Sequence, residues 1–510
     1  MKFNESDILQ IQEKGLTKEE VERQIQIFKR GNIKVDIQEA ATLSNGISAI
    51  SDEQRTDYIR DFEHKKDELD LLKFVPASGA ATRMFKALHN FVFEFDPKSE
   101  DLREYLDKKG DASLQLFFNN IEQLPFYDAA MKASKEDYSD FDNLSNDEQK
   151  KIFAENVLYS KGLGLSDLPK GLVPFHNYDG TIVTAFEEHL YEAANYANSN
   201  GIVKSHFTVG QGDKEKFEAE FDKIKNRVEE KTVLKFDISY SYQDPKTDTI
   251  AVDDENAPFR TEEGKMFFRP GGHGALIDNL NQQDADLIFI KNIDNVVTWA
   301  NLGDVVDYKK MLAGKLIELR AKSFNLIEKL GNNPSEEVNK EAINFLKKEL
   351  FVKSVSESES AAELIEKLDR PLRICGMVKN EGEPGGGPFL VKDEEGEISL
   401  QIIEGAQIDD DNPEQVKIVQ ESTHFNPVDI VCSIKTPKGD TYNLNDYVDP
   451  NMSFIANKTK DGKPLKALER PGLWNGAMAK WNTVFVEVPV TTFNPVKTVS
   501  DLLKDSHQPS

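Results

Sequence analysis

The chain has 510 residues, which at about 150 residues per domain corresponds to roughly three folding units or to one enlarged domain with insertions. Its 63 basic and 90 acidic residues give a formal net charge of −27, which repels nucleic acid and anionic membrane surfaces. Hydrophobic residues make up 38% of the chain and include 31 phenylalanines, so the composition excludes an acidic disordered protein. A substrate that bears phosphate would need a local basic pocket within this acidic background.

The sequence shows no targeting or membrane segment. The N-terminus has no apolar stretch of the signal-peptide kind, and no run approaches the roughly 20 apolar residues of a membrane helix. The two cysteines, Cys375 and Cys432, each lie in an apolar strand-like run, which is typical of buried thiols in a reducing compartment. We therefore expect a soluble cytoplasmic protein with no nucleic-acid or membrane partner.

In chain order, residues 1–66 have helical periodicity and predict an N-terminal helical cap or lead-in. Residues 67–505 are predicted to form one enlarged α/β domain. Two polar, helix-forming stretches, at about 90–160 and 304–368, predict helical insertions into this domain. The last part, residues 370–505, is rich in predicted strands separated by Gly, Pro and Asp clusters.

Strands alternate with helices through the middle of the chain. Apolar runs at 71–75, 202–209 and 287–290 predict buried strands, and Thr184 has the sequence context of a helix N-cap. Such alternation favours a mixed, mostly parallel sheet that is covered by helices on both faces.

A loop of small residues follows the first predicted strand and precedes a helix. It consists of Ala77, Ser78, Gly79, Ala80, Ala81, Thr82 and Arg83, with Lys86 one turn later. Backbone N–H groups in such a loop can approach phosphate oxygens, and the basic side chains add positive charge. The loop is neither G-x-G-x-x-G nor a Walker A sequence, which disfavours a dehydrogenase or a P-loop NTPase. A tight turn that packs against the sheet explains the loop equally well.

Asp294 comes just after the predicted strand 287–290. Ligands of open α/β sheets bind beyond the carboxyl ends of the strands, where a carboxylate can hold Mg²⁺. An Asx turn or helix cap formed with Asn292 and Asn295 is the commoner explanation for a residue in this context.

Two further segments place polar side chains in loops. Glycines on either side of His273, in Pro270-Gly-Gly-His-Gly274, leave room for a ligand, although a turn with an exposed histidine has the same sequence. Lys497 follows a proline-ordered turn and is a plausible phosphate contact, although most lysines simply face water. The other histidines, His176 and His507 among them, form no pair with the spacing of zinc ligands.

Taken in order, these segments resemble the signature set of UDP-sugar pyrophosphorylases, nucleotidyltransferases with a GT-A-like Rossmann sheet. The similar segments are the glycine-rich loop (77–83), the Pro-Gly-Gly-His-Gly motif (270–274), the metal-site strand (289–295) and Phe493-Asn-Pro-Val-Lys-Thr-Val-Ser-Asp-Leu-Leu503. The chain as a whole also resembles the bacterial domain-of-unknown-function family 4301, in which residues like 74–86 and 269–280 are typical.

The resemblance implies transfer of a nucleotidyl group from a nucleoside triphosphate, UTP by analogy, to a sugar 1-phosphate, with release of pyrophosphate and with Mg²⁺ as cofactor. It implies that the backbone of the loop cradles the triphosphate, that Arg83, Lys86 and Lys497 contact phosphates, and that Asp294 holds the metal. Gly272 and His273 would then contact the nucleotide, and Gln243 would face its base.

The chain departs from the family loop at Ser78 and Ala81, where glycines are usual. Ala81 would be strained if its position required a positive φ. A second hypothesis is therefore a nucleotide-sugar or phosphate-binding protein that has lost turnover, and a third is a scaffold whose helical insertions bind another protein. The enzyme hypothesis predicts that Asp294, the loop and Lys497 converge, and that Arg83, Lys86 and Lys497 form a positive island.

Overall fold

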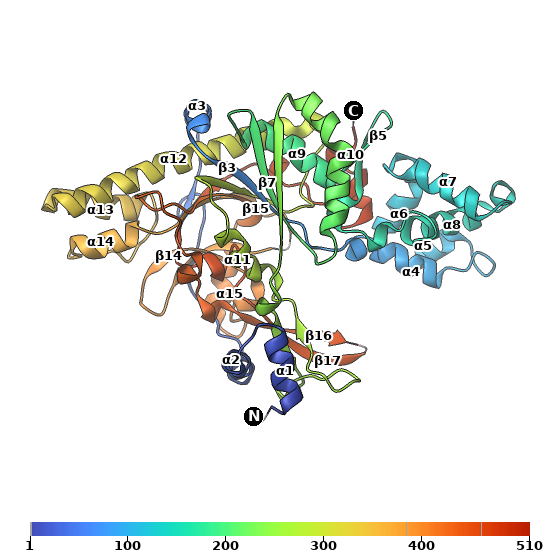
Figure 1. Cartoon of the computed structure of the whole chain (residues 1–510), viewed down its shortest axis with the longest axis horizontal. Helices are drawn as coiled ribbons and strands as arrows, with labels where there is room; N and C mark the ends of the chain where they lie inside the picture. Colours follow the sequence, from blue (N-terminus) through green and yellow to red (C-terminus); the bar gives the residue numbers. More distant parts are fainter. Residues whose placement is uncertain (1–2, 384, 461, 510) are drawn as a thin grey trace. The chain divides into compact units, whose positions relative to one another are not determined.

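A computed structural model describes residues 3–383, 385–460 and 462–509 of the chain (Figure 1). The chain forms two compact units, each assembled from three separate stretches of sequence. Unit 1 consists of Met1–Phe74, Ser241–Ile290 and Tyr308–Pro489, and unit 2 of Val75–Tyr240, Lys291–Asp307 and Val490–Ser510.

The main sheet of unit 1 is mixed. Its strands lie in the order β2 (Ile47–Ser48), β18 (Asn482–Glu487), β12 (Leu372–Lys379), β15 (His424–Ser433), β11 (Leu287–Ile290) and β3 (Leu71–Pro76), the last of which crosses into unit 2 after Phe74. Strand β15 is antiparallel to both of its neighbours, whereas the pairs β2–β18, β18–β12 and β11–β3 are parallel. This arrangement agrees with the predicted mixed, mostly parallel sheet.

Helices cover both faces of this sheet. Because side chains alternate along a strand, Ile288 and Ile290 of β11 share one face, on which they pack in one apolar cluster with Leu280 of α11 (Leu276–Asn281). Phe289 points to the other face and meets Phe62 of α3 (Asp52–Lys65) edge-on, with 6.2 Å between ring centroids. Strand β11 is therefore buried on both sides, which explains its uninterrupted apolar sequence.

Unit 1 contains two smaller sheets and further helices. One sheet has the order β1 (Asp36–Ala40), β13 (Gly387–Lys392), β14 (Ile398–Ile403), and the other β10 (Phe268–Arg269), β9 (Thr249–Val252), β17 (Lys463–Glu469), β16 (Phe454–Lys460). The helices are α1 (Glu5–Glu13), α2 (Lys18–Arg30), α12 (Leu302–Asn332, in unit 1 from Tyr308), α13 (Glu336–Lys348), α14 (Ala361–Leu368) and α15 (Pro413–Gln420). The stretch 304–368, predicted to be helical, contains most of α12 together with α13 and α14.

The segment 1–66, predicted as an N-terminal helical cap or lead-in, is not helical throughout. Helices α1, α2 and α3 are present, but β1 pairs with β13 and β2 pairs with β18. The sequence of β1, Asp-Ile-Gln-Glu-Ala, has little intrinsic β preference, and its strand conformation comes from tertiary pairing. The segment thus contributes strands to two sheets of unit 1.

Unit 2 contains a second α/β region. Strand β7 (Ile202–Val209) pairs with β6 (Asn198–Ser199) and β8 (Lys235–Tyr242), β4 (Pro174–Tyr178) pairs with β5 (Thr181–Thr184), and the helices are α9 (Ala185–Tyr196) and α10 (Lys214–Thr232). Thr184 is the N-cap of α9, as predicted, because its Oγ1 accepts the N–H of Glu187 at 3.3 Å. Phe186 of α9 packs on Phe207 of β7, with 4.8 Å between ring centroids.

The stretch 90–160 is helical, as predicted, and lies in unit 2. It consists of α4 (Lys86–Glu94), α5 (Leu102–Lys109), α6 (Ala112–Asn119), α7 (Tyr127–Asp137) and α8 (Asn146–Leu158), which gather into one group (Figure 1). Their shared core contains Phe85, Phe91, Phe95, Phe117, Phe118, Phe126 and Phe153. In the part of the chain that the structure describes, no helix combines the length and the apolar character needed to cross a bilayer.

Candidate functional site

The small-residue loop after β3 is held by backbone pairing with residues 168–170. The carbonyl of Gly79 accepts the N–H of Lys170 at 2.9 Å, and the N–H of Ala81 donates to the carbonyl of Leu168 at 3.0 Å. Ala77 and Ala81 are fully buried, whereas Ser78, Gly79, Ala80 and Thr82 are exposed. Both proposed features of the loop therefore exist together: a tight turn packed on the fold, and an exposed stretch of small residues at its tip.

The loop follows a path that needs no left-handed residue. Neither Ala81 nor any other described residue of 77–83 has a positive φ, and Ala81 begins a 3₁₀ turn that ends at Arg83. The strain that a glycine-dependent loop would impose on Ala81 is thus absent. Among the described residues, the N–H groups of Ser78, Gly79 and Ala80 have no hydrogen-bond acceptor, so the exposed tip presents three backbone donors.

Asp294 lies in a cluster with two lysines. Its Oδ2 is 2.7 Å from Nζ of Lys170 and 4.0 Å from Nζ of Lys497. The side chains of Asp294 and Lys170 are 13% and 14% exposed, and that of Lys497 is 61% exposed. The turn after β11 is instead fixed by its neighbour Asn295, whose Oδ1 accepts the N–H of Asn494 at 2.8 Å. The carboxylate of Asp294 therefore pairs with lysines and does not form an Asx turn.

The backbone around Lys497 explains why its side chain is available. The N–H of Val496 donates to the carbonyl of Asp294 at 3.0 Å, and Val496 and Val499 are buried. The carboxylate of Asp501 accepts the N–H of Lys497 at 2.8 Å and begins a capped 3₁₀ segment. These contacts fix the main chain and leave Nζ of Lys497 facing Asp294.

Arg83 and Lys86 lie next to this segment. The N–H of Val499 donates to the carbonyl of Met84 at 3.0 Å, which joins the turn 83–86 to the Lys497 segment. The side chains of Arg83 and Lys86 are exposed, and neither has a carboxylate partner among the described residues. Their charges remain available to an anionic ligand.

Lys170 was not found by sequence reasoning. It lies 124 residues from Asp294 along the chain, and its position depends on the backbone pairing with Gly79. No spacing or composition marks a lysine that acts through such non-local pairing, so a single sequence offers no direct signal for it.

His273 and Gly272 lie in unit 1, where they pack on the loop 469–478. The ring of His273 stacks on Trp474 with centroids 4.3 Å apart, and its Nδ1 accepts the N–H of Leu473 at 3.1 Å. The proton of the neutral ring is therefore on Nε2. Burial of this ring lowers the pKa of His273 to about 4.

The glycines of this motif are required by close packing. A Cβ at Gly274 would lie 2.3 Å from the carbonyl oxygen of Pro471, and one at Gly271 would lie 2.5 Å from that of Thr247. Gln243 belongs to the same neighbourhood, because its Nε2 donates to Oγ1 of Thr247 at 3.3 Å. The structure thus brings Gln243, Gly272 and His273 together in unit 1.

Asp294 is the one carboxylate of this cluster that could hold a magnesium ion together with a phosphate ligand. Among the described residues, no three His, Cys, Asp or Glu side chains converge as a preformed metal centre. Mg²⁺ usually keeps several waters and takes one or two carboxylates together with substrate phosphates. Asp294 supplies one carboxylate, and the neighbouring lysines supply further charge for phosphate.

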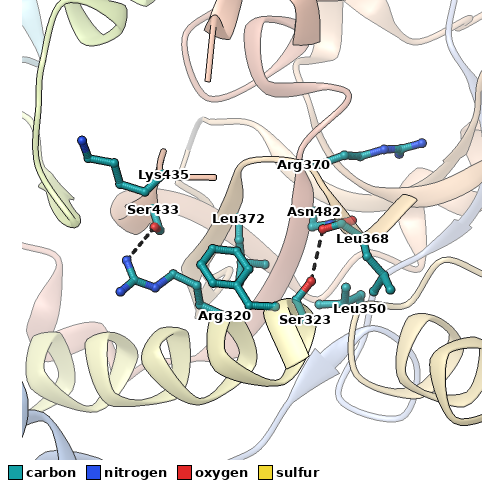
Figure 2. A pocket seen from close by; sticks show the side chains of 10 residues that line it. Arg320, Ser323, Leu350, Leu368, Arg370, Leu372, Ser433, Lys435 and Asn482 are labelled. Atoms are coloured by element: carbon teal, nitrogen blue, oxygen red, sulfur yellow. Dashed lines mark hydrogen bonds between the residues drawn. The ribbon is translucent and has the colours of Figure 1, made fainter. Parts of the chain in front are cut away.

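A separate pocket in unit 1 is too small for a substrate. Figure 2 shows Arg320, which donates to Oγ of Ser433 at 3.1 Å, and Ser323, which donates to the carbonyl of Leu368 at 3.1 Å. The space that these residues enclose has a volume of about 10 Å³, the room of a single water molecule. This pocket is a packing gap beside α12.

These observations define a mixed α/β protein with a lysine–aspartate cluster beside a small-residue loop in unit 2. The chain belongs to the family described as Domain of unknown function (DUF4301), whose model matches residues 4–508. No match was found among curated proteins.

The chain is also similar to solved structures of low sequence identity. One is the uridine diphosphate N-acetylglucosamine pyrophosphorylase from Trypanosoma brucei in complex with an inhibitor, at 10% identity over 91% of this chain and 72% of the other, with a TM-score of 0.46. Another is a mutant of the UDP-glucose pyrophosphorylase from Leishmania major in complex with UDP-glucose, at 12% identity over 98% of this chain and 77% of the other, with a TM-score of 0.43.

Proposed function

We propose that the protein is a nucleotidyltransferase with a GT-A-like core. It would transfer a nucleotidyl group from a nucleoside triphosphate, with UTP as the expected donor, to a sugar 1-phosphate. The observation that supports this proposal best is the convergence of Asp294, Lys170 and Lys497 in one cluster, joined to the exposed loop through the backbone of Lys170.

In the proposed reaction, an oxygen of the sugar phosphate attacks the α-phosphorus of the triphosphate. One P–O bond forms as the bond to the β-phosphate breaks, and pyrophosphate leaves with the electron pair of the broken bond. This chemistry needs alignment and positive charge but no protein nucleophile. A cluster of lysines beside one carboxylate suits those needs.

Each residue of the cluster has a role in this proposal. The N–H groups of Ser78, Gly79 and Ala80 would bind phosphate oxygens, and Arg83 and Lys86 would neutralise the triphosphate. Lys497, whose side chain is exposed, would contact the phosphates directly, while Lys170 would orient the carboxylate of Asp294. Bound at Asp294, Mg²⁺ would supply further positive charge for the phosphate oxygens.

We propose further that the unit 1 residues contact the nucleotide. Nε2–H of His273 has no acceptor among the described residues, Gly272 lies beside it, and Gln243 would face the base. A cytoplasmic location is part of the same proposal, because nucleoside triphosphates occur there and both cysteines are free and buried.

Pyrophosphate release tests the proposal. The full chain is assayed with Mg²⁺, a panel of nucleoside triphosphates and a panel of sugar 1-phosphates, beside Asp294→Asn and the control Asp128→Asn, which changes an exposed aspartate of α7. We expect release with at least one pair, loss of at least about a hundredfold in Asp294→Asn, and no change in the control. Turnover that survives Asp294→Asn would refute the role of this carboxylate.

The alternative is a nucleotide-sugar or phosphate-binding protein without turnover. Ser78 and Ala81 motivate it, because they stand where the resembling family has glycines, but Ala81 is unstrained in this structure. It predicts that no pair releases pyrophosphate, while calorimetry still detects binding of a UDP-sugar that Lys497→Met weakens.

A further inference from the structure

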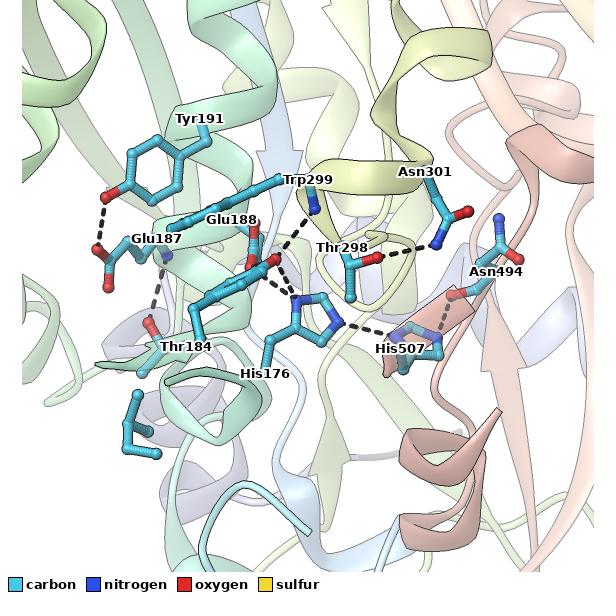
Figure 3. Close-up of polar contacts among 12 residues, drawn as sticks. His176, Thr184, Glu187, Glu188, Tyr191, Thr298, Trp299, Asn301, Asn494 and His507 are labelled. Atoms are coloured by element: carbon cyan, nitrogen blue, oxygen red, sulfur yellow. Dashed lines mark hydrogen bonds and ion pairs between the residues drawn. The ribbon is translucent and has the colours of Figure 1, made fainter. Parts of the chain in front are cut away.

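Two histidines that are distant in sequence form a buried chain of hydrogen bonds in unit 2. Figure 3 shows His176 of β4 between Glu188 of α9 and His507. Nδ1 of His176 lies 2.6 Å from Oε1 of Glu188, and its Nε2 lies 3.0 Å from Nδ1 of His507. Nε2 of His507 lies 3.1 Å from the carbonyl oxygen of Asn494. His176 and His507 are each 1% exposed, and Glu188 is 3% exposed.

The hydrogen bond between His507 and the carbonyl of Asn494 determines which atom donates in every other hydrogen bond of this histidine chain. The carbonyl of Asn494 can only accept, so Nε2 of His507 carries a proton. Burial, with His176 as a neighbour, lowers the pKa of His507 to about 3, so this ring is neutral and its Nδ1 accepts. His176 must then donate from Nε2. One further proton is needed between Nδ1 of His176 and Glu188 to complete the third hydrogen bond.

Loss of that proton leaves one link unsatisfied. If His176 keeps its proton on Nε2, its Nδ1 lone pair faces a carboxylate and can accept only from the Tyr178 hydroxyl, which lies 3.4 Å away and would have to give up its hydrogen bond to Glu188. If His176 moves its proton to Nδ1, His507 must shift its own proton to Nδ1, and a lone pair then faces the carbonyl of Asn494. All links can be made only while the Glu188–His176 pair holds a second proton besides the one on Nε2 of His176.

The last link bears on the Lys497 segment. Asn494 also donates its N–H to Oδ1 of Asn295, the residue after Asp294, and lies three positions before Lys497. We infer that the Glu188–His176–His507 chain is a proton-dependent anchor that positions the Lys497 segment against Asp294. Its effect on catalysis rests on the proposed function, whereas the anchoring itself does not.

Other groups face this chain and must be kept constant in any test. Tyr178 donates to Oε1 of Glu188 at 2.8 Å and accepts the N–H of Trp299 at 3.1 Å. Charged side chains from the surrounding elements also act on it: Glu187 and Arg227 beside Glu188, Lys231 over Trp299, and Asp501 and Lys504 near His507.

Two substitutions in this hydrogen-bond chain remove its dependence on the shared proton and still leave a donor for each hydrogen bond. In Glu188→Gln, the amide donates to Nδ1 of His176, so every link is made with no shared proton. In His507→Gln, the amide donates to Asn494 at any pH, independently of His176. Neither residue is one that we place in contact with substrate.

The test measures hydrogen exchange of the Asn494 and Val496 amides in the full chain over a series of pH values, as protection factors, while nitrogen NMR follows protonation of the histidine rings. We expect protection in the natural chain to fall about tenfold across the pH range in which the ring spectra show loss of the proton shared by Glu188 and His176, and to stay constant in both variants. Protection that does not change with pH in any of the three proteins would overturn the anchor, as would equal loss in all three.

The pH profile of pyrophosphate release separates this inference from the proposed function. If the protein releases pyrophosphate, Glu188→Gln should keep its activity at the pH values where the ring spectra show that the natural chain has lost the shared proton, and parallel profiles would overturn the anchor. If no pair of substrates reacts, the proposed function fails, and the exchange measurements still decide the anchor.

Discussion

The ion pair between Lys170 and Asp294 allows a quantitative test of the candidate site. Two unit charges 2.7 Å apart attract by about 6 kcal/mol at an effective dielectric constant of about 20. Desolvation of both groups offsets most of this attraction, and the pair is neither fully buried nor free in water. We therefore expect Lys170→Met to lower the free energy of unfolding by about 2 kcal/mol. The similar length of methionine keeps the packing of the lysine stem.

A double-mutant cycle isolates the pair from other effects of the substitution. Urea unfolding of Lys170→Met, Asp294→Asn and the double variant should give a coupling energy of about 1–2 kcal/mol. Lys132→Met is the matched control, because Lys132 forms an exposed pair with Glu136 at 3.9 Å and should change stability by less than about 0.5 kcal/mol. A coupling energy below about 0.3 kcal/mol would refute the pair, and with it the claim that Lys170 orients Asp294.

Three further outcomes follow from the described geometry. Gly79→Ala should keep the free energy of unfolding within about 0.5 kcal/mol of that of the natural chain, because a Cβ at this position meets no atom within 4 Å. The same substitution should weaken pyrophosphate binding in calorimetry. Unchanged affinity would show that the loop is not part of the site. Gly274→Ala should cost about 2–3 kcal/mol in urea unfolding because its Cβ would lie 2.3 Å from the carbonyl of Pro471, and a neutral result would contradict this packing. The pKa of His273 is about 4 in the fold, below its ordinary value of 6.5, so the unfolded chain binds more protons between these values. Stability is therefore lost as the pH falls from about 6.5 to about 4, by up to about 3 kcal/mol for this residue, and His273→Asn should remove that part of the acid sensitivity in urea titrations at the two pH values.

Local signals in the sequence predicted the parts of the site that depend on local structure. The order of strand, small-residue loop and helix placed the loop 77–83 correctly, and the position of Asp294 after a buried strand placed it at the end of β11. The capped segment around Lys497 is also local, since Asp501 fixes it from four residues away.

Contacts between distant stretches could not be predicted in this way. His176 and His507 are 331 residues apart, and Lys170 reaches Asp294 through a pairing of loops. Strand β1 has a sequence that reads as polar loop or helix until β13 pairs with it. In each case the deciding interaction belongs to a partner that no window of the sequence contains.

The interleaved construction of unit 2 has a consequence for its synthesis. Its three stretches end with residues 490–509, which supply Lys497 and the last link of the histidine chain. A ribosome that has made every residue up to 489 has produced Asp294 and Lys170 but not the segment that completes their surroundings. The cluster is therefore finished only after residues 490–509 have been made, and a fragment such as 75–240 expressed alone lacks both Asp294 and Lys497.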